Sequence, residues 1–478
     1  MLSSLNLTSK NPGYAELSQA IIDAVSSGRL PARSLLPPSR VLAASIGVSR
    51  DTVLHCYKHL KSLGWIETRS TGGTYVTGAP EIKHVTKDLT PDTVRLSEYG
   101  IRLLNDTREK FFAPEPVIYG AVPSQSLPTR RWKLAAQRAS ERLSNYSLMY
   151  DEAVLGRPEL RSAVSAHLNR STGIPCAFDE IAIFNVSFNA LALICRLFLE
   201  PGDVIATEEP GYGGVRDVAA YLGLELLPIT LDAEGISIEA LEQSNKKIKL
   251  VYVTPNHQEP SGLTMSFARR KRLLAWAQRN KAFVIEDDYE GFFHYGAKLP
   301  PSLKSMDTQD NVIYLGSFWQ VLYPITTLCY TVLPVSFMGV LQSAKRNTCS
   351  LTENLAQLAV AEMLDDGFLQ KHVRKLEANF GQKRRTLIYE LKRVFGARVS
   401  IPAQTGGLNM MVRFLNAKDQ VILQGGLKAN LPIASTETFY FQNKHRAGGE
   451  MLFCFAALNL ENLSKRIESF AKSFGERD

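Results

Sequence analysis

Cysteine is scarce in this chain of 478 residues, and its spacing builds neither a metal site nor a disulfide framework. The six cysteines are scattered, with no CxxC pair and no cysteine–histidine cluster, at Cys56, Cys176, Cys195, Cys329, Cys349 and Cys454. This spacing suits a reducing cytoplasm. Because Glu16 and Asp23 interrupt the opening apolar positions, we also expect no signal peptide. We therefore predict a cytoplasmic protein without a bound metal.

Charge is missing from one long segment, between Asp310 and Lys345. The segment is long enough to cross a bilayer. It contains Gly316, Pro324 and Pro334, however, and its β-branched residues fall into two short runs. Two buried strands joined by a loop fit this pattern better, so we expect no membrane association.

The length of the chain predicts two or three domains, and its composition is that of a globular protein, with 45% apolar and 21% charged residues. The net charge of +8 is uneven, because residues 1–78 alone carry +4, from eight basic and four acidic side chains. A small domain with concentrated positive charge is typical of nucleic-acid binders.

Residues 14–78 show the pattern of three helices followed by a hairpin. Apolar residues recur at helical spacing over Tyr14–Ser27, which predicts the first helix. A second helix is expected from Ser39, its N-cap, with Val41 facing inward. A third helix is expected after Ser49, its N-cap. Two strand-like runs, Trp65–Thr68 and Thr74–Val76, flank a turn with Gly72 and Gly73.

The third predicted helix carries Arg50, Thr52, His55 and Lys58 on its outer side, and we expect these residues and the cap residue Ser49 to contact DNA. Such a helix after a tight turn has helix-turn-helix geometry, in which it enters the major groove of DNA while the glycine wing reaches the neighbouring backbone. The alternative from composition alone is a small helical domain with a solvated basic face.

The order and spacing of these motifs resemble the winged helix of the GntR family. The matching runs are Leu36–Ala43, Gly47–Val53 and Gly72–Val76, with Tyr57, Leu60 and Gly64. The resemblance implies that Arg40, Arg50 and Thr52 contact DNA and that Gly72 and Gly73 let the wing approach phosphates. Two residues depart from the family pattern: Pro38 replaces a serine, and Arg33 replaces a turn glycine.

Beyond the first 78 residues, a connecting segment over 79–117 has no steady apolar period, although a short helix near Ser97–Leu104 fits its sequence. From residue 118 to 478, strand-like and helix-like runs alternate, as in α/β proteins with a mainly parallel sheet. The strands are expected at Ile181–Asn185, Val204–Thr207, Leu250–Thr254, Phe283–Glu286 and Val312–Leu315, and helices at Phe188–Phe198 and Ala268–Asn280.

The turns after these strands resemble a fold-type I aminotransferase, in the form found in the MocR/GabR subfamily of GntR regulators. The matching runs are Glu208–Tyr212, Thr254–Gly262, Glu286–Tyr289 and Tyr314–Phe318. The resemblance implies a winged helix-turn-helix followed by an α/β aminotransferase-like domain.

Several positions that would hold pyridoxal phosphate are altered. In such domains the coenzyme forms an imine with a lysine and rests in a phosphate cradle. By the resemblance, Gln320 stands in place of the lysine, Thr327 in place of a phosphate-binding arginine, and Val186 and Phe188 in the cradle loop. Trp319 and Phe188 add bulk, and the run Met451–Phe455 lacks the arginine that binds a substrate carboxylate. We therefore expect no catalysis and no coenzyme, or at most non-covalent binding.

Other positions of the former site are retained, namely Tyr212, His257, Asp287 and Tyr289. Asp287 and Tyr289 are either held by internal hydrogen bonds or line a pocket for an amine or another polar effector. Cys329 and Cys454 are either buried structural thiols or redox sensors.

These observations predict a transcription regulator that binds a double-stranded DNA operator. The alternatives are a working aminotransferase fused to a DNA-binding domain, and a regulator that senses non-covalent pyridoxal phosphate or a small amine. The resemblance also implies a head-to-tail, domain-swapped homodimer that reads two half-sites.

Overall fold

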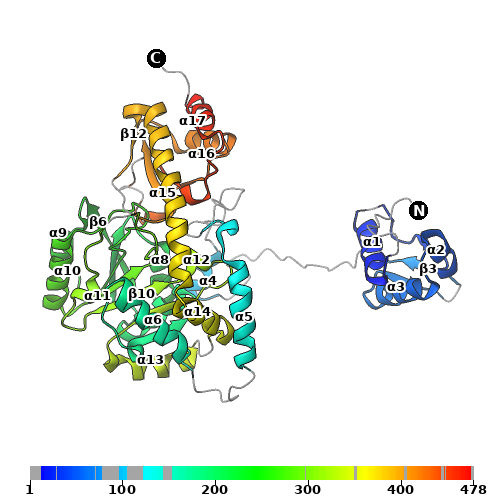
Figure 1. Ribbon diagram of the computed structural model, residues 1–478, viewed down its shortest axis with the longest axis horizontal. Coiled ribbons are helices and arrows are strands. Elements are labelled where there is room, and N and C mark those ends of the chain that lie inside the picture. The colour runs from blue at the N-terminus through cyan, green and yellow to red at the C-terminus, as the bar shows by residue number, and fades with distance from the viewer. Residues whose placement is uncertain are drawn as a thin grey trace. The chain divides into compact units, whose positions relative to one another are not determined.

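The computed structural model describes residues 12–27, 29–69, 72–77, 96–104, 122–143, 153–295, 298–348, 352–402, 406–442, 446 and 448–474. The chain divides into two compact units, Met1–Leu96 and Ser97–Asp478. Each unit has its own buried core and is described separately (Figure 1).

The first unit is a three-helix domain with a small sheet. Its elements are α1 (Tyr14–Ser26), β1 (Leu35–Leu36), α2 (Ser39–Ile46), α3 (Arg50–Ser62), β2 (Ile66–Thr68) and β3 (Thr74–Val76). The sheet order is β1-β3-β2, all antiparallel. Leu17 and Ile21 of α1 pack in one core with Val53 and Leu60 of α3, because the apolar residues of each helix share a face.

Several expectations for this unit need correction. Ser39 is the first residue of α2 and not its cap; the cap position is Pro38, which has no side-chain acceptor. Val41 is 55% exposed and does not face the core. Strand β1 was not expected, because two leucines beside a Pro-Pro pair give no strand period; β1 forms through its pairing with β3.

The second unit is built on an eight-stranded sheet in the order β4-β11-β10-β9-β8-β5-β6-β7. Strands β10, β9, β8, β5 and β6 are mutually parallel, whereas β11 and β7 are antiparallel to their neighbours. The strands are β4 (Ile181–Phe184), β5 (Val204–Glu209), β6 (Glu225–Asp232), β7 (Gly235–Ile236), β8 (Ile248–Val253), β9 (Phe283–Asp288), β10 (Val312–Ser317) and β11 (Cys329–Val332).

Helices cover both faces of this sheet (Figure 1), as an alternating βα chain requires. The helices of this unit up to Asp365 are α4 (Glu98–Leu104), α5 (Thr129–Leu143), α6 (Pro158–Ser171), α7 (Ser187–Phe198), α8 (Gly213–Leu222), α9 (Ile238–Glu242), α10 (Phe267–Asn280), α11 (Leu303–Met306), α12 (Trp319–Leu322), α13 (Val335–Thr348) and α14 (Asn354–Asp365). The expected short helix in the connecting segment is α4, whose Tyr99 packs edge-on against Tyr221 of α8, with ring centroids 5.5 Å apart.

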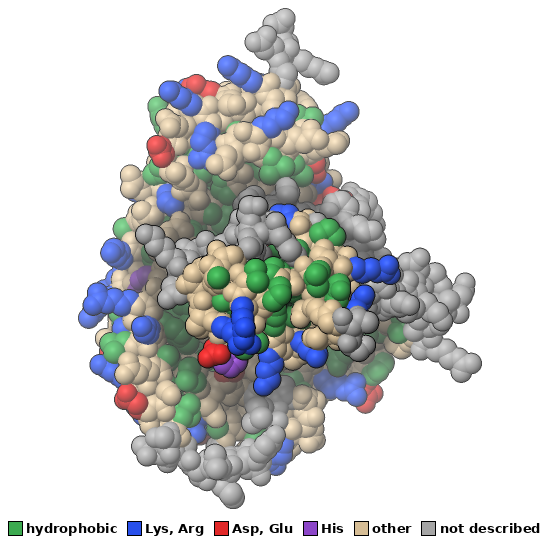
Figure 2. Space-filling model, turned by 90° about the vertical axis from the view of Figure 1, so that its right-hand side faces the viewer, with side chains coloured by type: hydrophobic (Ala, Val, Ile, Leu, Met, Phe, Trp, Pro, Cys, Tyr) green, Lys and Arg blue, Asp and Glu red, His purple; other side chains and the backbone are tan. Residues whose placement is uncertain are grey.

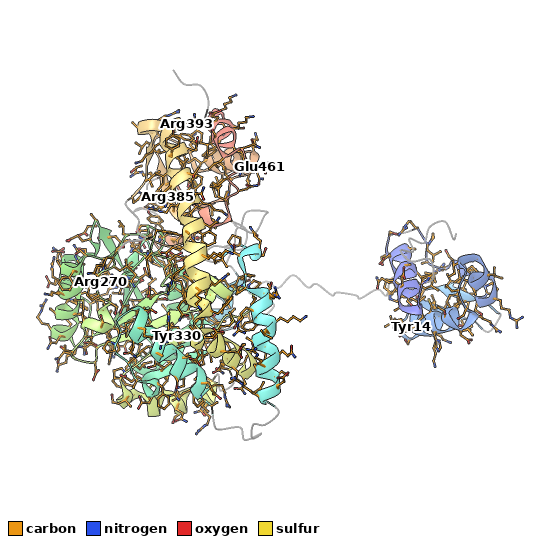
Figure 3. All side chains as sticks on the ribbon, viewed as in Figure 1. Tyr14, Arg270, Tyr330, Arg385, Arg393 and Glu461 are labelled. Carbon is orange, nitrogen blue, oxygen red and sulfur yellow. The ribbon has the colours of Figure 1, made fainter. Side chains whose placement is uncertain are left out.

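A second, antiparallel sheet follows the long helix α15 (Phe368–Phe395). Its order is β12-β13-β15-β14, and its strands are β12 (Val399–Ser400), β13 (Met410–Phe414), β14 (Ile433–Ser435) and β15 (Glu450–Phe453). Helices α16 (Asp419–Lys428) and α17 (Leu463–Lys472) accompany it. Figure 3 labels Arg385 and Arg393 on the part of α15 that runs toward this sheet.

The uncharged segment between Asp310 and Lys345 forms β10 and β11, which pair antiparallel around the short helix α12, and then most of α13. The expected pair of buried strands is present, and the remainder of the segment is helical. Within the described part of the chain, no helix is long and apolar enough to span a membrane. The same described residues contain no group of three or more His, Cys, Asp or Glu side chains placed to hold a metal ion.

Candidate functional site

Helix α3 begins with a hydroxyl cap, as the sequence predicts. The Ser49 side chain accepts the backbone N–H of Thr52 at 3.1 Å, and the two hydroxyl oxygens lie 2.8 Å apart. This cap fixes the start of the helix. The Thr52 hydroxyl, expected to contact DNA, is therefore already bonded to Ser49 and half-buried.

The remaining residues predicted to contact DNA are exposed: Arg40, Ser49, Arg50, His55, Lys58, Gly72 and Gly73. The His55 ring lies against Tyr14 of α1, with centroids 6.2 Å apart; Figure 3 labels Tyr14. Figure 2 shows Lys and Arg side chains on the surface of the protein together with exposed hydrophobic ones. Contact of these residues with DNA stays a prediction.

The wing joins β2 to β3. Gly72 and Gly73 have φ angles of +90° and +108°, which favour glycine, and a Cβ on Gly73 would lie 2.8 Å from Leu35. The Arg69 guanidinium is held by the Glu67 carboxylate at 2.7 Å and by the Tyr75 ring at 4.5 Å.

In the large unit, buried polar groups gather where parallel strands end. The Tyr252 hydroxyl of β8 donates to Oδ2 of Asp287 on β9 at 2.6 Å. On β5, Glu208 Oε2 accepts both the hydroxyl of Thr254, at 2.7 Å, and its backbone N–H, at 3.1 Å. The carboxyl ends of parallel strands are where such sheets hold their ligands.

Burial governs the protonation of these carboxyls. It raises the pKa of Asp287 to about 7, and the negative charges of Asp288 and Glu208 act in the same direction, while the Tyr252 hydroxyl opposes them. Burial also raises the pKa of Glu208 and of Glu290 to about 7. A carboxyl is disfavoured as an anion where water is excluded.

Gln320 is fully buried in α12. Its carboxamide is close enough to Glu290 to lower the pKa of that carboxyl, yet neither its nitrogen nor its oxygen reaches hydrogen-bonding geometry with a described residue. Glu290 accepts the backbone N–H of Leu408 at 3.2 Å, and a Cβ on Gly407 would overlap it.

His257 closes this polar cluster. It is 2% exposed, its ring stacks on His294 at 5.4 Å, and neither ring nitrogen has a hydrogen-bond partner among the described residues. Burial lowers its pKa to about 3, so the ring is neutral. A Cβ on Gly406 would overlap its Nε2 atom. The structure thus brings Glu290 and His257 to one short turn, Gly406–Leu408, with Gln320 beside Glu290.

Arg270 anchors the loop that carries His257. It is fully buried, and its Nη2 donates at 2.9 Å to the carbonyl of Pro255 and to Oδ1 of Asn256 (Figure 3). Its Nη1 lies 3.8 Å from Glu286, whose pKa burial raises to about 7 although the guanidinium lowers it.

Three of the other positions predicted for a degenerate coenzyme site pack against aromatic rings. Phe188 of α7 packs against Tyr221 at 6.3 Å, and Trp319 stacks on Tyr323 at 3.7 Å. Tyr212 stacks on Tyr252 at 6.1 Å. All of the following are partly exposed: Val186, Phe188, Tyr212, Tyr289, Trp319 and Thr327.

The burial of Cys329 and Cys454 argues against a redox-sensing role for their thiols. Cys329 and Cys454 are 0% and 2% exposed, and burial raises the pKa of Cys454 to about 11. Reactive cysteines need an accessible thiolate. The structural alternative is therefore favoured for both.

Sequence reasoning missed Glu208, Tyr252 and Glu290 as members of the cluster. The usable signal was polarity within buried strands, because Tyr252 interrupts an apolar run and its hydroxyl must find a partner. Glu290 gave less signal, since its partners come from residues more than a hundred positions away.

A winged helix-turn-helix followed by a fold-type I aminotransferase domain defines a class of transcription regulators. The comparisons agree with both halves: residues 13–76 match the bacterial regulatory proteins of the gntR family, and residues 121–430 match aminotransferase class I and II. The chain belongs to the class I and II aminotransferase family and is a GntR-family helix-turn-helix transcription regulator.

The chain is similar to individual relatives over most of their length. The chain is 25% identical over 467 residues to a probable rhizopine catabolism regulatory protein, MocR, of Rhizobium meliloti, covering 97% of this chain and 94% of the relative. It is 29% identical over 411 residues to the uncharacterized HTH-type regulator YdeL of Bacillus subtilis, covering 85% of each. Among solved structures, a kynurenine aminotransferase of Pyrococcus horikoshii has a TM-score of 0.69 and 25% identity, covering 82% of this chain and 98% of that one.

Proposed function

We propose that this regulator binds its operator through α3 and the wing, and that its aminotransferase-like domain is catalytically inactive and forms no imine with pyridoxal phosphate. Three domain limits belong to the proposal: a DNA-binding domain over 1–78, a connecting segment over 79–117 and a large domain over 118–478. A regulator that reads an operator works in the compartment that holds DNA, which here is the cytoplasm.

The proposed loss of catalytic activity rests mainly on the identity of residue 320, which is glutamine. By its position after the Gly316–Phe318 run, it corresponds to the lysine that binds the coenzyme in aminotransferases. A carboxamide nitrogen shares its lone pair with the carbonyl, so it does not attack an aldehyde. The side chain is also fully buried, and a neutral carboxamide does not supply the positive charge of a lysine.

The surroundings of Asp287 also oppose the coenzyme. Burial raises the pKa of this carboxyl to about 7, and the neighbouring carboxyls of Asp288 and Glu208 act in the same direction, which favours the neutral acid over the anion that would pair with a protonated coenzyme ring. The Tyr252 hydroxyl also already donates to its Oδ2 at 2.6 Å. We conclude that the residues present do not fit a covalently held coenzyme.

The test uses the full-length protein and pyridoxal phosphate. The mixture is treated with borohydride, which reduces an imine to a stable amine, and the intact mass is measured. We expect no increment on the wild-type chain above that of a control incubated with pyridoxine, which lacks the aldehyde. Stoichiometric labelling of one lysine in the large domain would overturn the proposal.

The operator half of the proposal has its own test. The full-length protein is used to select duplexes from a random DNA pool, and their binding is measured with and without competitor DNA. We expect a recurrent motif with paired half-sites, matching a head-to-tail dimer. Failure to enrich any motif would refute sequence-specific binding, and a monomeric mass by light scattering would refute the dimer.

A second candidate function is the sensing of a small polar effector. It is favoured by the side-chain nitrogen and oxygen atoms of His257 and Gln320, which have no hydrogen-bond partner among the described residues. Buried polar groups without partners are costly, and a bound molecule would satisfy them. The nearby carboxyls Glu208, Asp287 and Glu290 favour an amine over an anion. Equilibrium dialysis separates the alternatives: micromolar retention of pyridoxal phosphate would indicate a non-covalent coenzyme, and selective retention of amines an amine sensor.

A further inference from the structure

One apolar side chain of helix α3, Leu54, is exposed and does not belong to the core of the first unit. Val53, Cys56 and Leu60 are buried in the core of the first unit. Tyr57 is half-buried and its hydroxyl donates to the carbonyl of Pro37 at 2.7 Å. Leu54, in contrast, is 43% exposed in the middle of the helix.

The position of Leu54 is set by helical spacing. Residues four apart lie on the same side of a helix, so Arg50, Leu54 and Lys58 form one stripe, with Leu54 between the two cations. All three are exposed. An apolar side chain between two basic ones is complementary to a partner surface that is anionic on both sides and apolar between them.

Double-stranded DNA has this arrangement. Its phosphates line both sides of the major groove, and the one apolar group on its floor is the C5 methyl of thymine. We propose that Leu54 is a specificity-determining residue that contacts a thymine methyl group in each operator half-site. The inference rests on the proposed function, because it requires α3 to enter the major groove.

The test removes only the methyl group. In the duplex selected with wild-type protein, each thymine is replaced in turn by deoxyuridine, which keeps every hydrogen-bonding atom of the base. We expect one position in each half-site where the replacement weakens binding on the order of fourfold, the equivalent of about one buried methyl group. The measurement is a titration of full-length protein at fixed salt.

Variants of Leu54 test whether this side chain makes the contact with the thymine methyl group. With Leu54→Ala, the penalty for deoxyuridine at that position is expected to fall below about twofold, while other positions keep their effects. The matched control is Val41→Ala, which truncates another exposed apolar side chain, on α2 (55% exposed, against 43% for Leu54), and should keep the wild-type pattern. Leu54→Gln serves as a second variant if circular dichroism shows that the alanine protein is misfolded.

Each outcome is decisive. A duplex whose affinity is unchanged by deoxyuridine at every thymine would overturn the inference, as would a penalty that persists in both Leu54 variants. In either case the protein would still bind an operator, so the proposed function would stand. If Leu54→Ala instead leaves DNA binding intact and changes the oligomeric state, the stripe is a protein contact and the inference is wrong.

Discussion

The Tyr252 hydroxyl lies 2.6 Å from Oδ2 of Asp287, and both side chains are buried on neighbouring parallel strands. The acid that would face a coenzyme ring in an aminotransferase therefore has a partner from within the chain. The pair joins β8 to β9 at the edge of the sheet where the other buried carboxyls gather. Asp287 thereby gains a structural role that needs no ligand.

Removing this hydroxyl tests the role of the pair. Tyr252→Phe leaves the ring in place but deprives a buried acid of its donor, and we expect the free energy of unfolding to fall by about 1–3 kcal/mol. The measurement is urea denaturation followed by circular dichroism. The matched control is Tyr389→Phe, because Tyr389 is 64% exposed and its hydroxyl can bond water instead. Equal stability of the two variants would show that the hydrogen bond contributes nothing.

The buried carboxyls predict a pH dependence that Glu290→Gln isolates. Burial raises the pKa of Glu290 to about 7, so the folded protein retains a proton that the unfolded chain loses near pH 4.5. Its contribution to stability is complete below that pH and is lost as the pH rises through about 7. Glutamine mimics the protonated acid and does not titrate.

We therefore expect the wild type to lose stability relative to Glu290→Gln as the pH increases from about 4.5 to 7, with a constant difference above that range. The measurement is the unfolding free energy of both proteins at matched pH values. Taking the difference cancels the opposing contribution of His257, which both proteins share and whose lowered pKa acts in the other direction. A difference that is flat with pH would contradict burial of a titrating acid.

Local patterns predicted most elements but not their assembly. The α7 and α10 helices and five sheet strands lie within a few residues of the ranges read from the sequence, because apolar periodicity and capping residues are local signals. Val41 was misjudged because α2 has only eight residues, too few for its period to reveal which face is buried.

The cluster at Gly406–Leu408 illustrates what the sequence could not reveal. Gln320 and His257 are recognisable in the sequence as polar residues next to strand ends, whereas Glu290 is not. The turn that Glu290 and His257 contact is supplied by a distant segment. Contacts between residues so far apart in the sequence depend on the packing of the whole domain, so a local sequence pattern does not predict them.

Arg33 occupies a backbone conformation that favours glycine. Its φ angle is +67°, while its N–H donates to the carbonyl of Val76 at 2.7 Å. We expect Arg33→Gly to stabilise the first unit by about 0.5–1 kcal/mol. Glycine relieves the strain of the left-handed backbone, and part of that gain is offset because glycine loses more backbone entropy on folding. Arg33→Ala is the control, because it removes the charge and retains the strain. If both variants weaken operator binding equally, the guanidinium contacts DNA; no gain in stability from glycine would contradict the strain.

Arg50 is exposed at the first turn of α3, where the resemblance to GntR regulators implies contact with DNA. We expect Arg50→Ala to weaken operator binding by about 1–3 kcal/mol and to relax the preference at one base pair. The comparison variant is Arg29→Ala, an exposed arginine beyond the end of α1, which should change affinity much less. The readout is a footprint and a titration on specific and scrambled duplexes. An unchanged footprint would remove α3 from the interface.

The thiols give the last prediction. Burial raises the pKa of Cys56, Cys176 and Cys454 to about 11 and that of Cys195 to about 12, so very little thiolate exists at pH 8. We expect iodoacetamide to alkylate these residues and Cys329 slowly in the folded protein and rapidly in urea, as measured by peptide mass spectrometry. Peroxide at concentrations that leave the fold intact should not alter operator affinity. Rapid native labelling of Cys329 or Cys454, together with a peroxide-dependent loss of DNA binding, would restore the redox-sensing alternative that their burial argues against.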